Sequence, residues 1–205
     1  MEKNQVNQES SKDSFIFIVI SLFLICIIGI VLAYFLYFKN KAIVDSEKMI
    51  EDYIANFDKE KAITDTNYLS LEVSETVEDV TVITKTTIDY SDETNMFYEL
   101  QIDDILISSI YKENDAYILN NVELASDVTD ELIKSYLNTL LTTYINDVLY
   151  YDVCLETYEI SDPTYSLSDD TLTLTSGIKV ATFNKFGLIT SYSDSGISLN
   201  ASYIK

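Results

Sequence analysis

The stretch VTVITKTTIDYSDETNMFYELQI, residues 80–102, decides the fold of the chain. Apolar or threonine side chains occupy alternate positions from Val80 to Tyr90 and again from Met96 to Ile102. Successive side chains of a β-strand point to opposite faces, so this alternation predicts two strands that each bury one face. The polar residues 91–95 between them are typical of a turn. The stretch therefore predicts an antiparallel hairpin.

More alternating segments lie on both sides of this hairpin, and one amphipathic helix at residues 130–149 interrupts them. The predicted strands lie at residues 69–73, 105–111, 116–121, 151–160, 172–174, 180–183, 188–190 and 197–203, and those at 180–183 and 188–190 form a hairpin around the turn 184–187. Beyond residue 38 only two substantial helices are predicted, at 39–62 and 130–149, and these are too few for repeated crossovers between parallel strands. The predicted fold class is therefore α+β, with an antiparallel sheet covered by helices.

The N-terminal region predicts a membrane anchor. Residues 14–38, SFIFIVISLFLICIIGIVLAYFLYF, contain no charged side chain, and as a helix they would reach about 37 Å, more than the roughly 30 Å of a bilayer core. We expect a disordered tail at 1–13, a single-pass transmembrane signal-anchor at 14–38 with the lipid bilayer as its partner, a juxtamembrane helix at 39–62 and a sheet domain at 63–205. Because long domains translocate largely regardless of charge, the expected location is the cell membrane, with a cytoplasmic N-terminus and an extracytoplasmic C-terminal domain.

The composition excludes several functions. The chain carries 34 Asp and Glu against 13 basic residues, all of them Lys, and has no His. Without His it lacks the base of Ser-His-Asp and Cys-His catalytic pairs and the imidazole ligands of metal sites. A net charge of −21 repels nucleic acid. We therefore predict no enzyme activity, no cofactor, no metal and no nucleic-acid partner.

Three local features suggest chemistry, and each also has a simpler interpretation. Asp194-Ser195-Gly196 matches the motif of aspartic proteases but occurs once, and a hairpin turn accounts for the same residues. The acidic clusters at 89–95 and 162–170 lack the spacing of a calcium-binding EF-hand loop. Cys154 has acidic neighbours and is interpreted as a small apolar residue of a strand. None of them predicts a catalytic or metal site.

The order of elements resembles the lipoprotein-carrier (LolA-like) group of extracytoplasmic domains. That order is a helix, several antiparallel strands, an amphipathic helix, and further strands that end in a hairpin of the type TFNKFGLITSYS, residues 182–193. The resemblance covers residues 42–205 as an order of elements and matches at the level of residues only in this hairpin. It implies a strongly curved antiparallel sheet whose concave face, covered by helices, houses a lipid or another apolar ligand.

Two functions are expected from these observations. The first is a membrane-anchored, non-catalytic domain that binds an apolar ligand such as a lipid or lipoprotein, with helix 130–149 as a lid. The alternative is a structural or accessory subunit of a membrane protein complex that acts through protein contacts. A carrier requires an apolar cavity of some 300 to 1,000 Å³, whereas a subunit would pack the helix solidly onto the sheet. The candidate surface for either function comprises Leu137, Leu140, Leu141, Tyr144, Tyr98 and Leu100.

Overall fold

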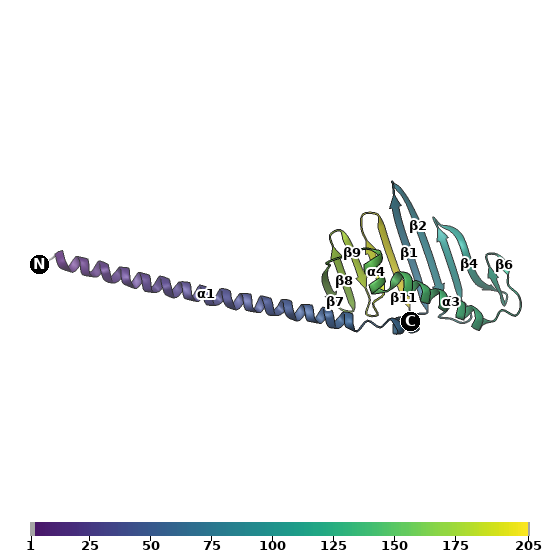
Figure 1. Cartoon of the computed structure of the whole chain (residues 1–205), viewed down its shortest axis with the longest axis horizontal. Coiled ribbons are helices and arrows are strands. Elements are labelled where there is room, and N and C mark those ends of the chain that lie inside the picture. Colours follow the sequence, from purple (N-terminus) through teal and green to yellow (C-terminus); the bar gives the residue numbers. More distant parts are fainter. Residues whose placement is uncertain (1–2, 205) are drawn as a thin grey trace. The chain divides into compact units, whose positions relative to one another are not determined.

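The computed structural model describes residues 3–204, and within them the side chains of residues 28–203. The chain divides into two compact units, Met1–Glu51 and Asp52–Lys205. The first unit is formed by helix α1, Lys3–Ala55, whose last turn belongs to the second unit (Figure 1). All other helices and strands belong to the second unit.

The structure corrects the prediction of a transmembrane helix. In the part of the chain that it describes, no helix combines the length and the apolar character needed to cross a membrane. Within the predicted span 14–38, side chains are described only from Ile28 to Phe38, which corresponds to about 16 Å of helix, and charged residues follow from Lys39. The single-pass and signal-anchor assignments depended on that helix and are corrected with it. The predicted tail 1–13 and residues 14–27 lie outside the residues whose side chains are described.

A turn separates α1 from the next helix. The predicted helix at 39–62 is broken, because α1 ends at Ala55 and α2 spans Lys59–Asp65. Asp58 caps α2, and its carboxylate accepts a hydrogen bond from the backbone N–H of Lys61 at 2.9 Å. Such a cap satisfies a backbone donor that the first turn of a helix leaves free. The cap therefore fixes the start of α2.

The second unit is built on one antiparallel sheet of eleven strands, in the order β6-β5-β4-β3-β2-β1-β11-β10-β9-β8-β7 (Figure 1). The strands are β1 Tyr68–Val77, β2 Val80–Asp89, β3 Phe97–Ile102, β4 Ile105–Glu113, β5 Ala116–Leu119, β6 Val122–Glu123, β7 Thr164–Ser168, β8 Thr171–Ser176, β9 Lys179–Phe183, β10 Ile189–Ser193 and β11 Ile197–Ile204. The predicted hairpin at 80–102 is confirmed, with Ile88 of β2 opposite Tyr98 of β3. The chain forms two meanders, β1 to β6 and β7 to β11, which join where β11 pairs with β1.

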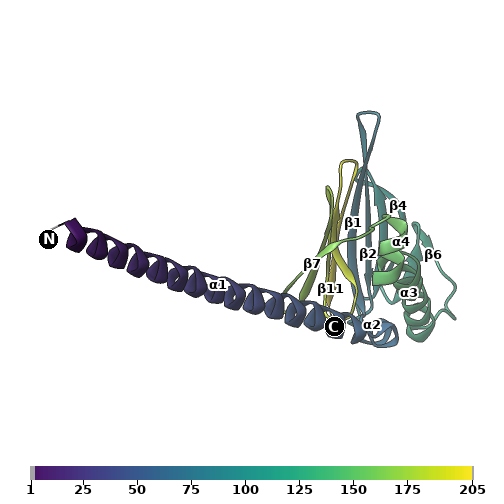
Figure 2. The ribbon, with the colours of Figure 1, turned by 60° about the vertical axis from the view of Figure 1, so that its left-hand side comes forward.

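Three helical segments connect the two meanders and lie on the same face of the sheet (Figure 2). They are α3 (Asp130–Tyr144), the π-helix η1 (Ile145–Leu149) and α4 (Tyr151–Thr157). The helix predicted at 130–149 is present, although its last five residues adopt π-helical geometry. The strand predicted at 151–160 is wrong, because most of this segment forms α4. We call the face that carries these helices the inner face of the sheet.

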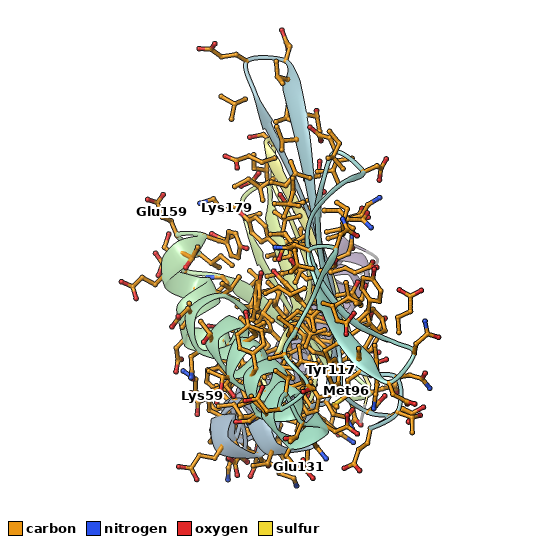
Figure 3. All side chains as sticks on the ribbon, turned by 90° about the vertical axis from the view of Figure 1, so that its right-hand side faces the viewer. Lys59, Met96, Tyr117, Glu131, Glu159 and Lys179 are labelled. Carbon is orange, nitrogen blue, oxygen red and sulfur yellow. The ribbon has the colours of Figure 1, made fainter. Side chains whose placement is uncertain are left out.

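Contacts with the sheet explain why α4 is a helix. Tyr151 packs edge-on against Phe183 of β9, with ring centroids 5.1 Å apart, and Tyr158 stacks on Tyr192 of β10 at 4.0 Å. A helical turn directs both tyrosines toward the sheet, because residues seven apart share one side of a helix. The Lys179 ammonium donates hydrogen bonds to the carbonyl oxygens of Tyr158 and Glu159 at the end of α4 (Figure 3). A cation at this position favours the helix.

Candidate apolar binding surface

Strand pairing arranges the inner-face residues of the first meander in rows that cross the sheet. The row that lies under the helices contains Leu69, Ile88, Tyr98 and Ile110, which are opposite one another on β1 to β4. All four side chains are buried. This row is the part of the core that α3 covers.

The rows farther from the helices are progressively more exposed. Leu71 and Thr86 are buried in the second row, and the Thr86 hydroxyl lies 3.3 Å from the hydroxyl of Tyr144 on the helical side. In the third row Val73 is half-buried, whereas Ile102, which lies opposite Ile105, is exposed. The cover that the helices provide therefore ends between the second and the third row.

Beyond this boundary the inner face shows an apolar surface, which we call the open strip. It comprises Val77, Val80, Val82, Ile102 and Ile105, whose exposed fractions range from 37% to 65%. Val77 is opposite Val80, and Ile102 is opposite Ile105, so aliphatic pairs lie at the end of each hairpin. Between these pairs the same face carries Glu75, opposite Val82, and Thr84, opposite Ile102. In Figure 3 the tip of the longest hairpin, β1–β2, stands clear of the helices, which agrees with this exposure.

Three of the six residues predicted for the candidate surface are buried between α3 and the sheet. Leu137 and Leu141 of α3 are only 0% and 1% exposed, and Tyr98 is buried as well. The other three predicted residues, Leu140, Tyr144 and Leu100, are half-buried. Leu100 precedes Ile102 by two residues on β3 and therefore shares its face. The open strip itself was missed, although the alternation of Val80 and Val82 up to the turn was a signal for it.

Tyr98 lies in the covered first row of the inner face, two rows away from Ile102 of the open strip. Burial raises the pKa of Tyr98, and the nearby Tyr144 and Tyr136 raise it further. Protonated phenols can donate and accept hydrogen bonds without carrying charge. Tyr98 therefore gives the covered part of the inner face a polar but uncharged group.

The outer face of the sheet has a different chemistry. Around Glu72 it forms a hollow of about 240 Å³ that is lined mainly by polar groups, and a second hollow of about 390 Å³ adjoins Asn200. The residues of the first hollow are Ser70, Leu71, Glu72, Lys85, Thr87, Glu99 and Gln101. The exposed apolar surface of the first meander therefore belongs mainly to the inner face.

Turn geometry accounts for the residues that resembled a protease motif. The Asp194 carboxylate accepts hydrogen bonds from the backbone N–H groups of Gly196 and Ile197, at 2.8 and 2.7 Å, and from the Tyr192 hydroxyl at 2.7 Å. The bond from Tyr192 is the largest cause that holds the pKa of Asp194 below its ordinary value. Such bonds fix a turn between two strands. They hold Asp194 in the hairpin that joins β10 to β11.

The other candidate groups also have structural partners. Asp92 accepts hydrogen bonds from the backbone N–H and the hydroxyl of Thr94, as expected for a turn. Cys154 lies in α4 and not in a strand, and burial raises the pKa of its thiol to about 12. Within the described residues, no three acidic or thiol side chains are grouped so that they could hold a metal ion.

The fold and this surface define the class of the molecule. It contains an α+β domain with one open antiparallel sheet, helices over part of one face, and an aliphatic strip that these helices leave uncovered. No family model matches the chain, and no curated protein matches it with significant similarity.

Proposed function

We propose that the chain is a non-catalytic module that binds an apolar ligand, such as the acyl chain of a lipid or lipoprotein, on the open strip. The observation that carries this proposal is the set of exposed aliphatic side chains Val77, Val80, Val82, Ile102 and Ile105 on the inner face, among which Glu75 and Thr84 also lie. Apolar surface gains about 25 cal/mol per Å² when it leaves water. A ligand that covers the strip would gain this free energy.

The order of elements supports the same proposal. Six strands, a helical connection and five further strands form one antiparallel sheet, with the helices on one face. The resemblance to the LolA-like group rests on this order, and in that group the apolar ligand lies on the face that carries the helices. The open strip is on the corresponding face.

The proposed ligand lies beside α3 and not beneath it. Leu137 and Leu141 fill the space between α3 and the sheet, since both are almost completely buried. Displacing them would expose two leucines, at about 1.5 to 3 kcal/mol each. The uncovered rows beyond Thr86 need no such displacement.

An accessory subunit that binds protein is the second candidate function. It is favoured by the outer side of α3, where Leu132 and Tyr136 are exposed although they belong to the apolar stripe of the helix. Aromatic side chains with a polar tip are common at protein interfaces. A partner on this side of α3 would leave the open strip free.

Titration of the full chain with an uncharged fluorescent monoacylglycerol tests the first function. We expect saturable binding, and we expect Ile102→Asp to weaken it about tenfold or more, because a carboxylate would face the ligand. Ile178→Asp is the matched control, since Ile178 is equally apolar and 69% exposed but lies in the turn between β8 and β9. Absence of binding by the wild type, or equal weakening by both variants, would contradict the proposal.

A further inference from the structure

Half of strand β4 has no neighbour on one side. β5 pairs with β4 only from Ile110 to Glu113, and Asn120 bonds with the backbone of Ser109 just beyond. From Ile105 to Ser108, no strand in the described part of the chain pairs with the side of β4 that faces away from β3. We call residues 105–108 the β4 edge. Its backbone groups on that side are open to another extended segment.

The β4 edge carries unusually apolar side chains. Leu106 and Ile107 are 49% and 51% exposed, and they follow the exposed Ile105. The pairing with β3 shifts here, since Leu106 is opposite Gln101 while Ser108 is opposite Leu100, which leaves Ile107 as an extra residue. Edge strands are protected by Lys or Pro, by a bulge or by short length. Residues 105–108 contain the bulge at Ile107 but neither Lys nor Pro.

The half of the sheet that contains the β4 edge is strongly acidic. Residues 68–123, from β1 to β6, contain 13 Asp and Glu against 2 Lys, whereas residues 164–204 contain 3 acidic residues and 2 Lys. Both Lys of the acidic half form ion pairs, Lys85 with Asp104 at 2.7 Å and Lys112 with Asp130 at 2.8 Å. An approaching segment therefore meets an excess of negative charge around an apolar edge.

We infer that the β4 edge binds an extended protein segment that is both apolar and basic, and that this segment adds a strand to the sheet. Backbone hydrogen bonds of an added strand supply affinity, and alternate side chains supply specificity. A second copy of the chain is disfavoured as the occupant, because it would bring another acidic half against the first. The β4 edge shares only Ile105 with the open strip, so this site goes beyond the proposed function and can be tested separately.

A synthetic octapeptide of alternating lysine and isoleucine, blocked at both ends, serves as the probe for the full chain. We expect it to bind at least about tenfold more tightly than the corresponding glutamate-isoleucine peptide, because the charge of the partner decides the interaction at this surface. Binding should weaken as salt is added. It should also slow hydrogen exchange at the backbone amides of residues 105–108.

Variants distinguish the β4 edge from other apolar positions. Ile107→Lys should weaken binding of the lysine-isoleucine peptide about tenfold, since it removes an aliphatic contact and adds a repelling charge. Ile178→Lys is the matched control and should bind like the wild type. Val77→Asn, which changes the open strip on β1, three strands away from β4, should leave this peptide's affinity within about twofold of the wild-type value.

Four results would overturn the inference. The first two are equal affinity for the lysine and glutamate peptides, and unchanged hydrogen exchange at residues 105–108 when the lysine peptide is bound. The third is an equal loss of peptide affinity in Ile107→Lys and Ile178→Lys. The fourth is unchanged affinity for a peptide in which prolines replace two central isoleucines. Sedimentation of the chain without peptide tests whether the chain forms a dimer through the β4 edge. A dimer that already protects residues 105–108 would show that a second copy occupies the edge.

Discussion

Replacing Leu137 by alanine tests whether α3 is a packed part of the core or a lid above a ligand. Leu137 is fully buried, and removing buried methyl and methylene groups from such a site leaves a cavity. We expect Leu137→Ala to lower the free energy of unfolding by about 3 kcal/mol. For a domain of this size the melting temperature should fall by roughly 6 to 12 °C. Leu132, on the same helix but 57% exposed, is the matched control, and Leu132→Ala should cost less than about 0.5 kcal/mol.

Urea unfolding followed by circular dichroism and by tyrosine fluorescence measures both variants, because the chain has 16 Tyr and no Trp. The midpoint of Leu137→Ala should move to lower urea while the slope stays unchanged, as expected when only stability is altered. If Leu137→Ala were no more harmful than Leu132→Ala, α3 would not be packed as described. If an added monoacylglycerol restored the stability of Leu137→Ala alone, the ligand would lie beneath α3 after all.

Two further predictions concern turns. Gly187 has φ +76°, and a Cβ atom there would lie 2.8 Å from the Phe57 ring. Gly187→Ala should therefore destabilise the domain by about 2 to 4 kcal/mol, as measured by calorimetry. Gly177 has φ +63° with open space around it, so Gly177→Ala is the control and should cost only about 1 kcal/mol. The lowered pKa of Asp194 means that its stabilising effect is complete above the unfolded pKa of about 4 and is lost as the pH falls through the folded value. Asp194→Asn should therefore be about 1 kcal/mol less stable than the wild type at pH 7, and unfolding curves at successively lower pH should show this difference shrinking below about pH 4.

Local patterns predicted most of the sheet, because most of its strands show alternation over a few residues. The strands β6 and β7 were not predicted. The alternation from Val80 to Ile102 identified the hairpin and its turn correctly. The prediction for the segment beginning at Tyr151 was wrong, because its apolar residues fit both the period of a strand and the period of a helix. Tyr151, Cys154 and Tyr158 are spaced for one side of a helix, and contacts with distant strands decide in favour of that helix.

The candidate surface was harder to predict, because the exposure of a side chain depends on how far the neighbouring strands and helices extend. No local sequence pattern contains that information. Leu137 and Leu141 were correctly assigned to the apolar stripe of a helix, but the same stripe includes the exposed Leu132. Whether Leu106 is covered depends on where β5 ends, and that depends on the turn at Asn120. The start of α2 could have been predicted from the sequence, since Asp is a common N-cap residue and Asp58 caps this helix.

The pairing of β1 with β11 has a consequence for how the domain folds. Tyr68 lies opposite Ile204, so the middle of the sheet is assembled from segments at opposite ends of the domain sequence. Contacts between such distant segments slow folding, because a long loop must close before they form. During synthesis the first meander can fold early, yet the side of β1 that faces β11 stays unpaired until the final strand arrives. In that interval β1 is an open edge that can pair with the wrong chain, and loss of the last strand would make this state permanent.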